Sequence, residues 1–279
     1  MLNLCKPSAL RCRSGFSPTT RSRAEARPTL EHATIRAELR ALAAPDTALT
    51  QQRFFKTGPG QYGEGDVFLG IKVPPLRALA RQHRGVALPT IAALLDSHYH
   101  EERLFALLLL MQRYRAADKS GKQAAFDLYL GNTAHINNWD LVDVSAPHIV
   151  GCHLEQRSRA VLDTLARSPL LWERRIAIVA THHFIRHNDC ADTLRLARIL
   201  LRDEHDLIHK AVGWMLREVG KRDLAALESF LQTHQREMPR TMLRYAIERF
   251  EPPLRKRYLQ GKFGPAVFSN SEMSLNEGF

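Results

Sequence analysis

Apolar residues recur at helical spacing through most of the chain, from about residue 31 to about residue 260. In segments such as residues 208–220 they fall three and four positions apart, which places them on one face of an α-helix. No alternation of apolar and polar residues is long enough to predict a β-strand. Prolines and glycines stand between the periodic segments, where helices end. The pattern therefore predicts an all-α fold.

Five of the periodic segments resemble one another. Each opens with charged or polar residues and continues into an apolar helix, and the starts recur at intervals of roughly 35 residues, the period of paired-helix repeats. One helix pair cannot bury its apolar face alone, so such pairs stack into an α-solenoid whose equivalent helices line one surface. The five segments are residues 102–114, 139–151, 173–185, 208–220 and 239–250.

The two ends of the chain lack this periodicity. Residues 1–30 are rich in arginine and poor in acids, so we expect a disordered extension, although an acid-poor start can also be an organelle transit peptide. Residues 261–279 are expected to form a flexible tail, which leaves residues 31–260 as the repeat domain. The glycines of residues 57–71 lack the spacing of a phosphate-binding loop. This stretch is expected to connect an N-terminal helix to the first full repeat.

Charge indicates the class of partner, and cysteine content indicates the cellular compartment. Lys and Arg number 40 against 29 acids, and the formal net charge is +11. Arginine predominates and suits bidentate phosphate recognition, which favours a polyanionic partner. The four cysteines lack CxxC spacing, which argues against a zinc cage or a disulfide framework and suits a reducing compartment. No apolar run reaches the length of about 18 residues that a transmembrane helix needs, so no transmembrane helix is expected. With the reducing compartment that the cysteines suit, we expect a cytoplasmic location.

The polar openings of the repeats carry the candidate chemistry. Trp139 and Asp143 lie four apart and share one helix face, and Lys210 and Trp214 repeat that spacing. If these helices line one groove, it combines two tryptophans and one carboxylate with a row of cations, which suits a nucleic acid. Alternatively, the tryptophans could be core residues and Asp143 could pair with a neighbouring arginine. The candidate cations are Arg103, Arg174, Arg175, Lys210, Arg240 and Arg244.

A metal site is not expected. His182, His183 and His187 could offer ligands at helical spacing, but the HExxH motif is absent and no acidic or cysteine partner is expected for them. No nucleotide-binding motif is present either, so no cofactor is expected.

Four segments resemble a known family. They read YGEGDVFLGIKVPPLR at 62–77, NNWDLVD at 137–143, LWERRIAI at 171–178 and HKAVGWMLRE at 209–218. Together they are similar to the DNA alkylation repair family, the HEAT-like-repeat alkylpurine DNA glycosylases of the AlkD type. The resemblance covers roughly residues 50–258.

The resemblance implies a C-shaped stack of HEAT-like repeats that cradles duplex DNA in a concave groove. It implies hydrolysis of the N-glycosidic bond of cationic N3- and N7-alkylated purines, such as 3-methyladenine and 7-methylguanine, without base flipping. The functional residues of the family match Trp139, Asp143, Arg175 and Trp214, with Arg175 expected to clamp a phosphate. A carboxylate near the sugar stabilises the positive charge that develops there and orients water. We expect a monofunctional hydrolase that leaves an abasic site, with Lys210 as a phosphate contact.

Two other interpretations stay open from the sequence. A non-catalytic repeat protein that recognises DNA or RNA structure would bind without releasing a base. A protein-interaction scaffold would show no salt-sensitive binding to a polyanion. For the enzyme, we expect a partner in duplex DNA containing alkylated purines, neither a membrane nor an obligate protein partner, a monomeric state and association with the nucleoid.

Overall fold

Helices form where the apolar periodicity predicts them. In the computed structural model, which describes residues 30–261, no β-strand occurs among those residues, and an isolated bridge joins Val67 to Tyr99. The predicted all-α class is confirmed. The predicted extension and tail lie outside the described residues, apart from Leu30 and Gly261. The helices are α1 (Leu30–Ala41), α2 (Pro45–Phe54), α3 (Val73–Gln82), α4 (Leu88–Leu95), α5 (His100–Ala116), α6 (Lys119–Leu130), η1 (Thr133–His135), α7 (Trp139–Ala146), η2 (Pro147–Gly151), α8 (Ala160–Ala166), α9 (Leu171–Ala180), α10 (His182–Arg186), α11 (Ala191–Ile199), α12 (Asp206–Gly220), α13 (Leu224–His234), α14 (Arg240–Ala246) and α15 (Pro252–Leu259).

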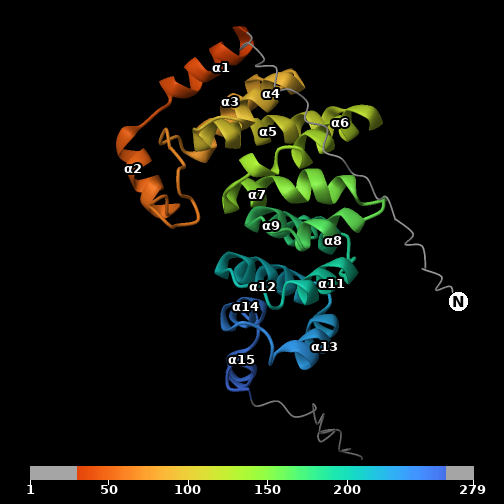
Figure 1. Ribbon diagram of the computed structural model, residues 1–279. Helices are drawn as coiled ribbons and strands as arrows, with labels where there is room; N and C mark the ends of the chain where they lie inside the picture. The colour runs from red at the N-terminus through yellow and green to blue at the C-terminus, as the bar shows by residue number, and fades with distance from the viewer. Residues whose placement is uncertain (1–29, 262–279) are drawn as a thin grey trace, which may run out of the picture.

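The helices stack in chain order as a solenoid (Figure 1). Those that open the five predicted repeats are α5, α7, α9, α12 and α14, and each contacts the next. Helices α6, α8, α11 and α13 lie along the other side of the stack (Figure 1). Helix α2 and the loop after it stand out to one side of α7, at the left of Figure 1. The predicted helical-repeat architecture is confirmed, while its curvature into a C stays a prediction.

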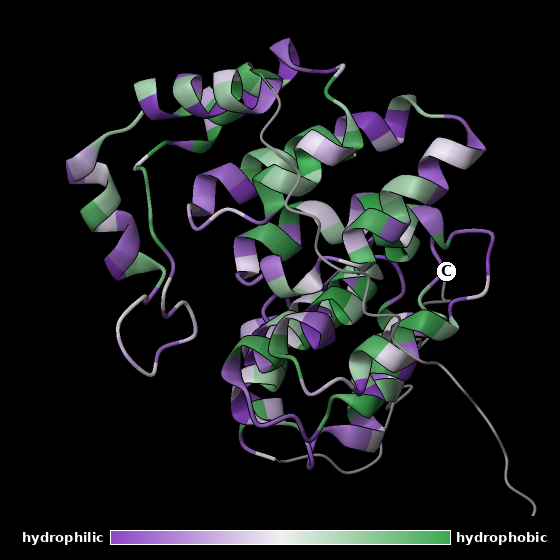
Figure 2. Cartoon of the chain, turned by 45° about the horizontal axis from the view of Figure 1, so that its top comes forward, coloured by the Kyte–Doolittle hydropathy of each residue, from purple (hydrophilic) through white to green (hydrophobic). Residues whose placement is uncertain are grey.

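One apolar cluster runs through the whole stack. It extends from Ile35 in α1 to Tyr258 in α15, and its largest fully buried side chains include Tyr129, Phe105 and Phe184. Figure 2 shows the apolar residues gathered where helices face one another, with hydrophilic residues on the outer faces. Among the described residues, no helix is both long and apolar enough to cross a membrane.

Two of the predicted helices are interrupted. Residues 139–151 form α7 followed by the π-helical turn η2, which begins at Pro147. Proline has no N–H to donate to the preceding turn, so the α-helical ladder cannot continue through it. Residues 173–185 likewise divide at Thr181, whose hydroxyl donates to the carbonyl of Ile178 at 2.6 Å.

A glycine lets α12 and α14 approach closely. A Cβ on Gly213 would lie 2.5 Å from the carbonyl oxygen of Met242 and 2.5 Å from the Cβ of Tyr245. A larger residue would push the two helices apart. The close approach brings Tyr245 to the face of α12 that carries Trp214.

The glycine-rich loop between α2 and α3 is held by a buried carboxylate. Glu101 in α5 accepts hydrogen bonds from the N–H groups of Leu69, Gly70 and Ile71 at 2.9, 2.8 and 3.1 Å. Gly70 has a φ of +84°, and a Cβ there would lie 2.0 Å from the carbonyl oxygen of Ala44. These amides are bound by a protein carboxylate, so this stretch is a structural connector, as the sequence predicts.

Candidate active site

Helices α7, α9, α12 and α14 and the loop after α2 surround a cavity of about 560 Å³, called here the Trp139 cavity. It brings together five of the residues that the sequence singles out: Trp139, Asp143, Arg175, Lys210 and Trp214. Asp143 is the only carboxylate among the described residues that line it. The expected combination of two tryptophans, one carboxylate and several cations therefore exists in space.

Trp139 is fixed at the start of α7 from two directions. The side chain of Asn138 caps the helix and accepts a hydrogen bond from the Trp139 backbone N–H at 2.8 Å. The indole stacks on Phe55, with ring centroids 5.3 Å apart, and meets Phe54 edge-on at 5.9 Å. Phe54 is 63% exposed and lines the cavity, so it offers an apolar surface to a ligand.

A buried network of charges connects α5, the loop after α2 and the start of α7 beside Trp139. His100 lies between two carboxylates, with Nδ1 3.2 Å from Asp66 and Nε2 2.8 Å from Asp140. Burial alone would lower the pKa of His100, but the hydrogen bonds with Asp140 and Asp66 raise it to about 9. His100 is therefore a cation at neutral pH. Burial opposes ionisation of Asp66, but hydrogen bonding from His100 and the charge of Arg103 outweigh it and lower the pKa of that carboxyl.

Asp143 and Arg175 form a bidentate pair across α7 and α9. Nε of Arg175 donates to Oδ1 of Asp143 at 2.9 Å, and Nη2 donates to Oδ2 at 2.8 Å. Withdrawal from solvent raises the pKa of Asp143, and the charge and hydrogen bonds of Arg175 only partly offset this effect. A carboxylate with a raised pKa is a stronger base than a solvated one.

The remaining arm of Arg175 is also engaged. Nη1 donates to the carbonyl oxygen of Leu207 at 2.6 Å, and Arg175 is only 5% exposed. In this geometry the guanidinium has no face turned to a phosphate. The expectation that Arg175 clamps a phosphate is therefore corrected: Arg175 orients Asp143 and ties α9 to the start of α12.

Two further cations were assigned wrongly. Arg103 is buried and pairs with Asp66 at 2.6 Å while donating to the carbonyl oxygen of Ser97 at 2.8 Å. Arg174 pairs with Asp203 at 2.6 Å and donates to the carbonyl oxygens of two residues before α9. Both guanidiniums stabilise the fold, because buried or half-buried carboxylates sit beside them. Neither lines the Trp139 cavity, so we no longer assign them to DNA.

Lys210 and Trp214 do face the cavity from α12. Lys210 is 40% exposed and pairs with Asp206 at 2.7 Å, and this hydrogen bond raises the pKa of the amine. Trp214 donates from Nε1 to Glu218 at 3.2 Å, and its ring lies 5.7 Å from that of His182. Arg240 and Arg244 in α14 are exposed and lie outside this cavity, and their contact with DNA stays a prediction.

Several lining residues escape reasoning from the sequence. Phe54 is the last residue of α2, and Lys56 and Tyr62 come from the connector after it, which carries no helical period. Tyr245 lies one residue after the predicted Arg244, on the equivalent repeat helix, which is the one available signal. Lys56 is exposed and has no carboxylate partner among the described residues, so it is the cation of the cavity most available to a phosphate.

The histidine cluster has an acidic neighbour after all. Glu155 lies 3.4 Å from His183 and 3.9 Å from His187, and the three ligand atoms lie within 4.8 Å of one another. The expectation that no acid accompanies these histidines is therefore wrong, since Glu155 comes from the turn after η2. Burial lowers the pKa of His183 despite the nearby Glu155 carboxylate, so their contact is not a permanent ion pair.

Comparison with known proteins gives this geometry a context. The model of the DNA alkylation repair enzyme family matches residues 35–250. The chain belongs to the DNA alkylation repair enzyme family. Membership makes it an enzyme of DNA repair, with DNA as its substrate.

The fold agrees with a solved structure of this family. A predicted DNA alkylation repair enzyme from Enterococcus faecalis is 20% identical, with a TM-score of 0.54, and the match covers 80% of this chain and 98% of that chain. At this identity the likeness concerns the fold alone. No curated protein matches the chain.

Proposed function

We propose that this repair enzyme is a glycosylase that hydrolyses the N-glycosidic bond of N3- and N7-alkylated purines in duplex DNA and leaves an abasic site. The observation that carries the proposal is the place of Asp143. It is the only acid among the described residues lining a cavity whose other charged members are Lys56, Arg175, Lys210 and Arg217. The phosphates of DNA repel an acid on the surface that binds them, so an acid at this position weakens binding and is explained by a chemical role.

The chemistry needs one carboxylate and water. An alkylated purine is cationic and leaves readily, and positive charge then develops on the deoxyribose. Asp143 stabilises this charge and orients or deprotonates the attacking water. Two charges about 4 Å apart at an effective dielectric of about 20 interact by roughly 4 kcal/mol, which corresponds to about a thousandfold in rate. Because Arg175 already shares the carboxylate, this figure is an upper bound.

The other lining residues hold the DNA around the reacting sugar. Trp139 and Trp214 offer ring faces to the sugar-phosphate backbone and exclude bulk water. Lys56 and Lys210 supply phosphate contacts, and Phe54 widens the apolar surface. Attack from the backbone side does not require the purine to leave the stack. Base release without flipping is therefore part of the proposal, as is a monomer acting at the cytoplasmic nucleoid.

Release of methylated base from duplex DNA is the decisive test. The wild-type protein should release 7-methylguanine from a methylated duplex, and Asp143→Asn should retain DNA affinity but lose up to about a thousandfold in single-turnover rate. Asp46→Asn is the matched control, because Asp46 is an exposed acid in α2 outside the cavity. Binding without base release by the wild type would instead identify a non-catalytic DNA-binding protein. Absence of salt-sensitive DNA binding would favour an interaction scaffold.

Hydrolysis rather than amine attack is expected from the state of Lys210. A Schiff-base mechanism needs a neutral amine, but the contact with Asp206 raises the pKa of Lys210 and keeps it charged. Borohydride added during turnover should therefore trap no protein–DNA adduct. An adduct that disappears in Lys210→Ala would reassign the protein as a glycosylase-lyase.

A further inference from the structure

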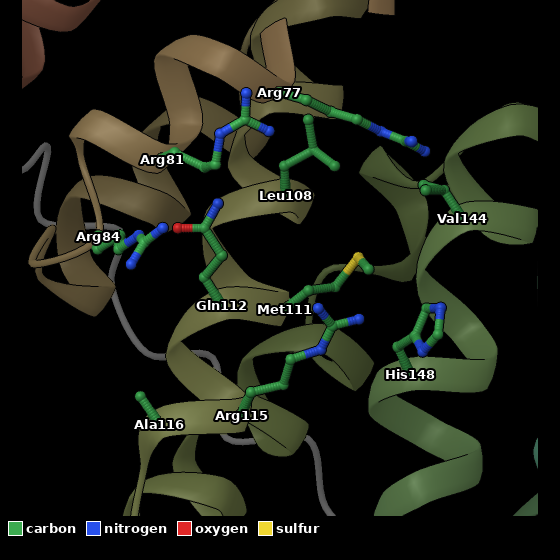
Figure 3. A pocket seen from close by; sticks show the side chains of 10 residues that line it. All are labelled: Arg77, Arg81, Arg84, Leu108, Met111, Gln112, Arg115, Ala116, Val144 and His148. Carbon is green, nitrogen blue, oxygen red and sulfur yellow. The ribbon is translucent and has the colours of Figure 1, made fainter. Parts of the chain in front are cut away.

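A second, larger cavity lies between α3, α5 and α7. Its volume is about 690 Å³, and it is called here the arginine pocket. Figure 3 shows Arg81 and Arg84 on the left, Arg77 across the top, Arg115 below, and Val144 and His148 of the α7–η2 segment on the right. The lining residues are Arg77, Arg81, Arg84, Leu108, Met111, Gln112, Arg115, Ala116, Val144 and His148.

The four arginines of this pocket lack the partners that other arginines of the fold possess. Arg103, Arg174 and Arg175 each pair with an aspartate. By contrast, none of the four pocket arginines has a carboxylate within ion-pair distance among the described residues, and no acid lines the pocket. All four are exposed, so solvent screens much of their repulsion, and their guanidiniums are accessible. Four guanidiniums around one acid-free hollow suit an anionic ligand.

The floor of the pocket is apolar. Leu108 and Met111 of α5 and Val144 of α7 lie between the arginine side chains (Figure 3). Gln112 stands among them, and its side-chain oxygen is buried without a hydrogen-bond partner in the described part of the chain. A bare phosphate would contact the guanidiniums but leave this floor uncovered. A nucleotide contacts both the apolar floor and the arginines, because its base or sugar covers the floor while its phosphate binds the guanidiniums.

The arginine pocket and the Trp139 cavity share one half-buried stripe of α7 and η2. The side chains of this segment that are not buried are Trp139, Asp140, Asp143, Val144 and His148. Asp143 lines the Trp139 cavity, while Val144, the next residue, lines the arginine pocket. The two hollows thus flank a single helix, whose diameter is about 10 Å. That distance is about three base steps of B-form DNA, each about 3.4 Å.

We propose that the arginine pocket binds an unpaired nucleotide of the DNA that occupies the Trp139 cavity. A fully paired duplex keeps its bases stacked inside and can offer the pocket only its backbone. A nucleotide displaced from the helix brings a phosphate and an apolar face together. The inference rests on the proposed function in requiring DNA in the Trp139 cavity, but it does not require base release.

The test compares two unmodified short duplexes that differ by a single unpaired thymidine. The wild-type protein should bind the bulged duplex about tenfold more tightly than the fully paired one, near the lower end of the effect of one stacked base. Equal affinity for the two duplexes would overturn the proposal. Deoxyadenosine monophosphate is titrated in parallel. If deoxyadenosine monophosphate binds but the protein does not prefer the bulged duplex, the ligand of the pocket is a free nucleotide and not a nucleotide of the DNA, and the proposal is overturned.

Gln112→Glu is the sharpest variant for this pocket. It changes the shape little and places a carboxylate among the arginines, which lowers the positive charge of the pocket and competes with an anionic ligand for the guanidiniums. The thermal midpoint should be retained or rise, while the preference for the bulged duplex disappears. Arg81→Ala combined with Arg115→Ala should abolish the same preference. Gln232→Glu on α13 is the matched control, because Gln232 is exposed and lies outside both cavities. The substitution makes the same change of charge as Gln112→Glu.

The result separates this inference from the proposed function. A preference that persists in Gln112→Glu would remove the arginine pocket from DNA recognition. If the wild type releases 7-methylguanine but shows no preference, the inference fails alone. If it shows a Gln112-dependent preference and releases no base, the pocket assignment stands and the glycosylase proposal fails.

Discussion

Asp143 supplies the carboxylate of this cavity, and Arg175 keeps that carboxylate ionised and oriented. Burial raises the pKa of Asp143, which strengthens it as a base but opposes its ionisation. The bidentate guanidinium restores charge and fixes the direction of both oxygens. Arg175 is therefore a positioning residue for the carboxylate.

Removing Arg175 should change the pH dependence of base release as well as its rate. Without the guanidinium, the pKa of the buried Asp143 rises further, so the carboxylate is protonated over a wider acidic range. The acidic limb of the single-turnover rate should move to higher pH in Arg175→Ala. Arg175→Lys should move it less, because a charge remains.

A merely structural role for Arg175 gives a different outcome. The rate would then fall by the same factor at every pH, with the limb in place. Arg198→Ala provides the control, since Arg198 is an exposed arginine of α11 outside both cavities.

The residues of the candidate site were partly foreseeable from the chain. The i, i+4 spacings placed Trp139 with Asp143 and Lys210 with Trp214, because helical periodicity is local. The partner of each arginine was not foreseeable, since Arg103 and Arg174 meet aspartates that lie 37 and 29 positions away. The same limit hid Glu155 beside the histidines.

At the scale of elements, the apolar period predicted helices well and their interruptions poorly. The starts of α5, α7, α9, α12 and α14 fall within two residues of the predicted segments. The π turn after Ala146 begins at Pro147. The proline is visible in the sequence, but the apolar period continues past it, so the prediction carried one helix through this position. The loop from residue 57 to 71 has no period at all, and its path depends on the distant carboxylate of Glu101.

The network around His100 joins three of these elements and makes a pH-dependent prediction. His100 of α5 binds Asp66 in the loop and Asp140 in α7. Its pKa rises from 6.5 to about 9 on folding, so its stabilisation is complete below pH 6.5 and declines as the pH approaches 9. One pKa unit is worth about 1.4 kcal/mol, so up to about 3 kcal/mol is at stake.

Urea unfolding across this pH range measures the effect. The free energy of unfolding should fall by about 2 to 3 kcal/mol between about pH 6.5 and 8.5. His98→Gln should keep the slope, because His98 is exposed, whereas His100→Gln should lose it along with overall stability. A wild-type stability that is flat over this interval would contradict a charged His100.

At the scale of the whole molecule, excess positive charge should govern the affinity for DNA. The chain carries a net charge of +11, and the cations left without buried partners include Lys56 and the four arginines of the arginine pocket. If about five phosphates are contacted, log K should fall against log[salt] with a slope near −4 to −5. Titration of a labelled duplex at several salt concentrations measures this slope, and a value near zero would exclude a DNA-binding groove.

The positions of the tryptophans give the molecule an optical property. The chain has three tryptophans, and two of them, Trp139 and Trp214, line the Trp139 cavity. The third, Trp172, meets Tyr62 of the cavity wall edge-on, with ring centroids 6.2 Å apart. Every indole emitter of this protein therefore lies in or beside one cavity. Its tryptophan fluorescence, excited where tyrosine absorbs little, is therefore a label-free signal of what enters that cavity.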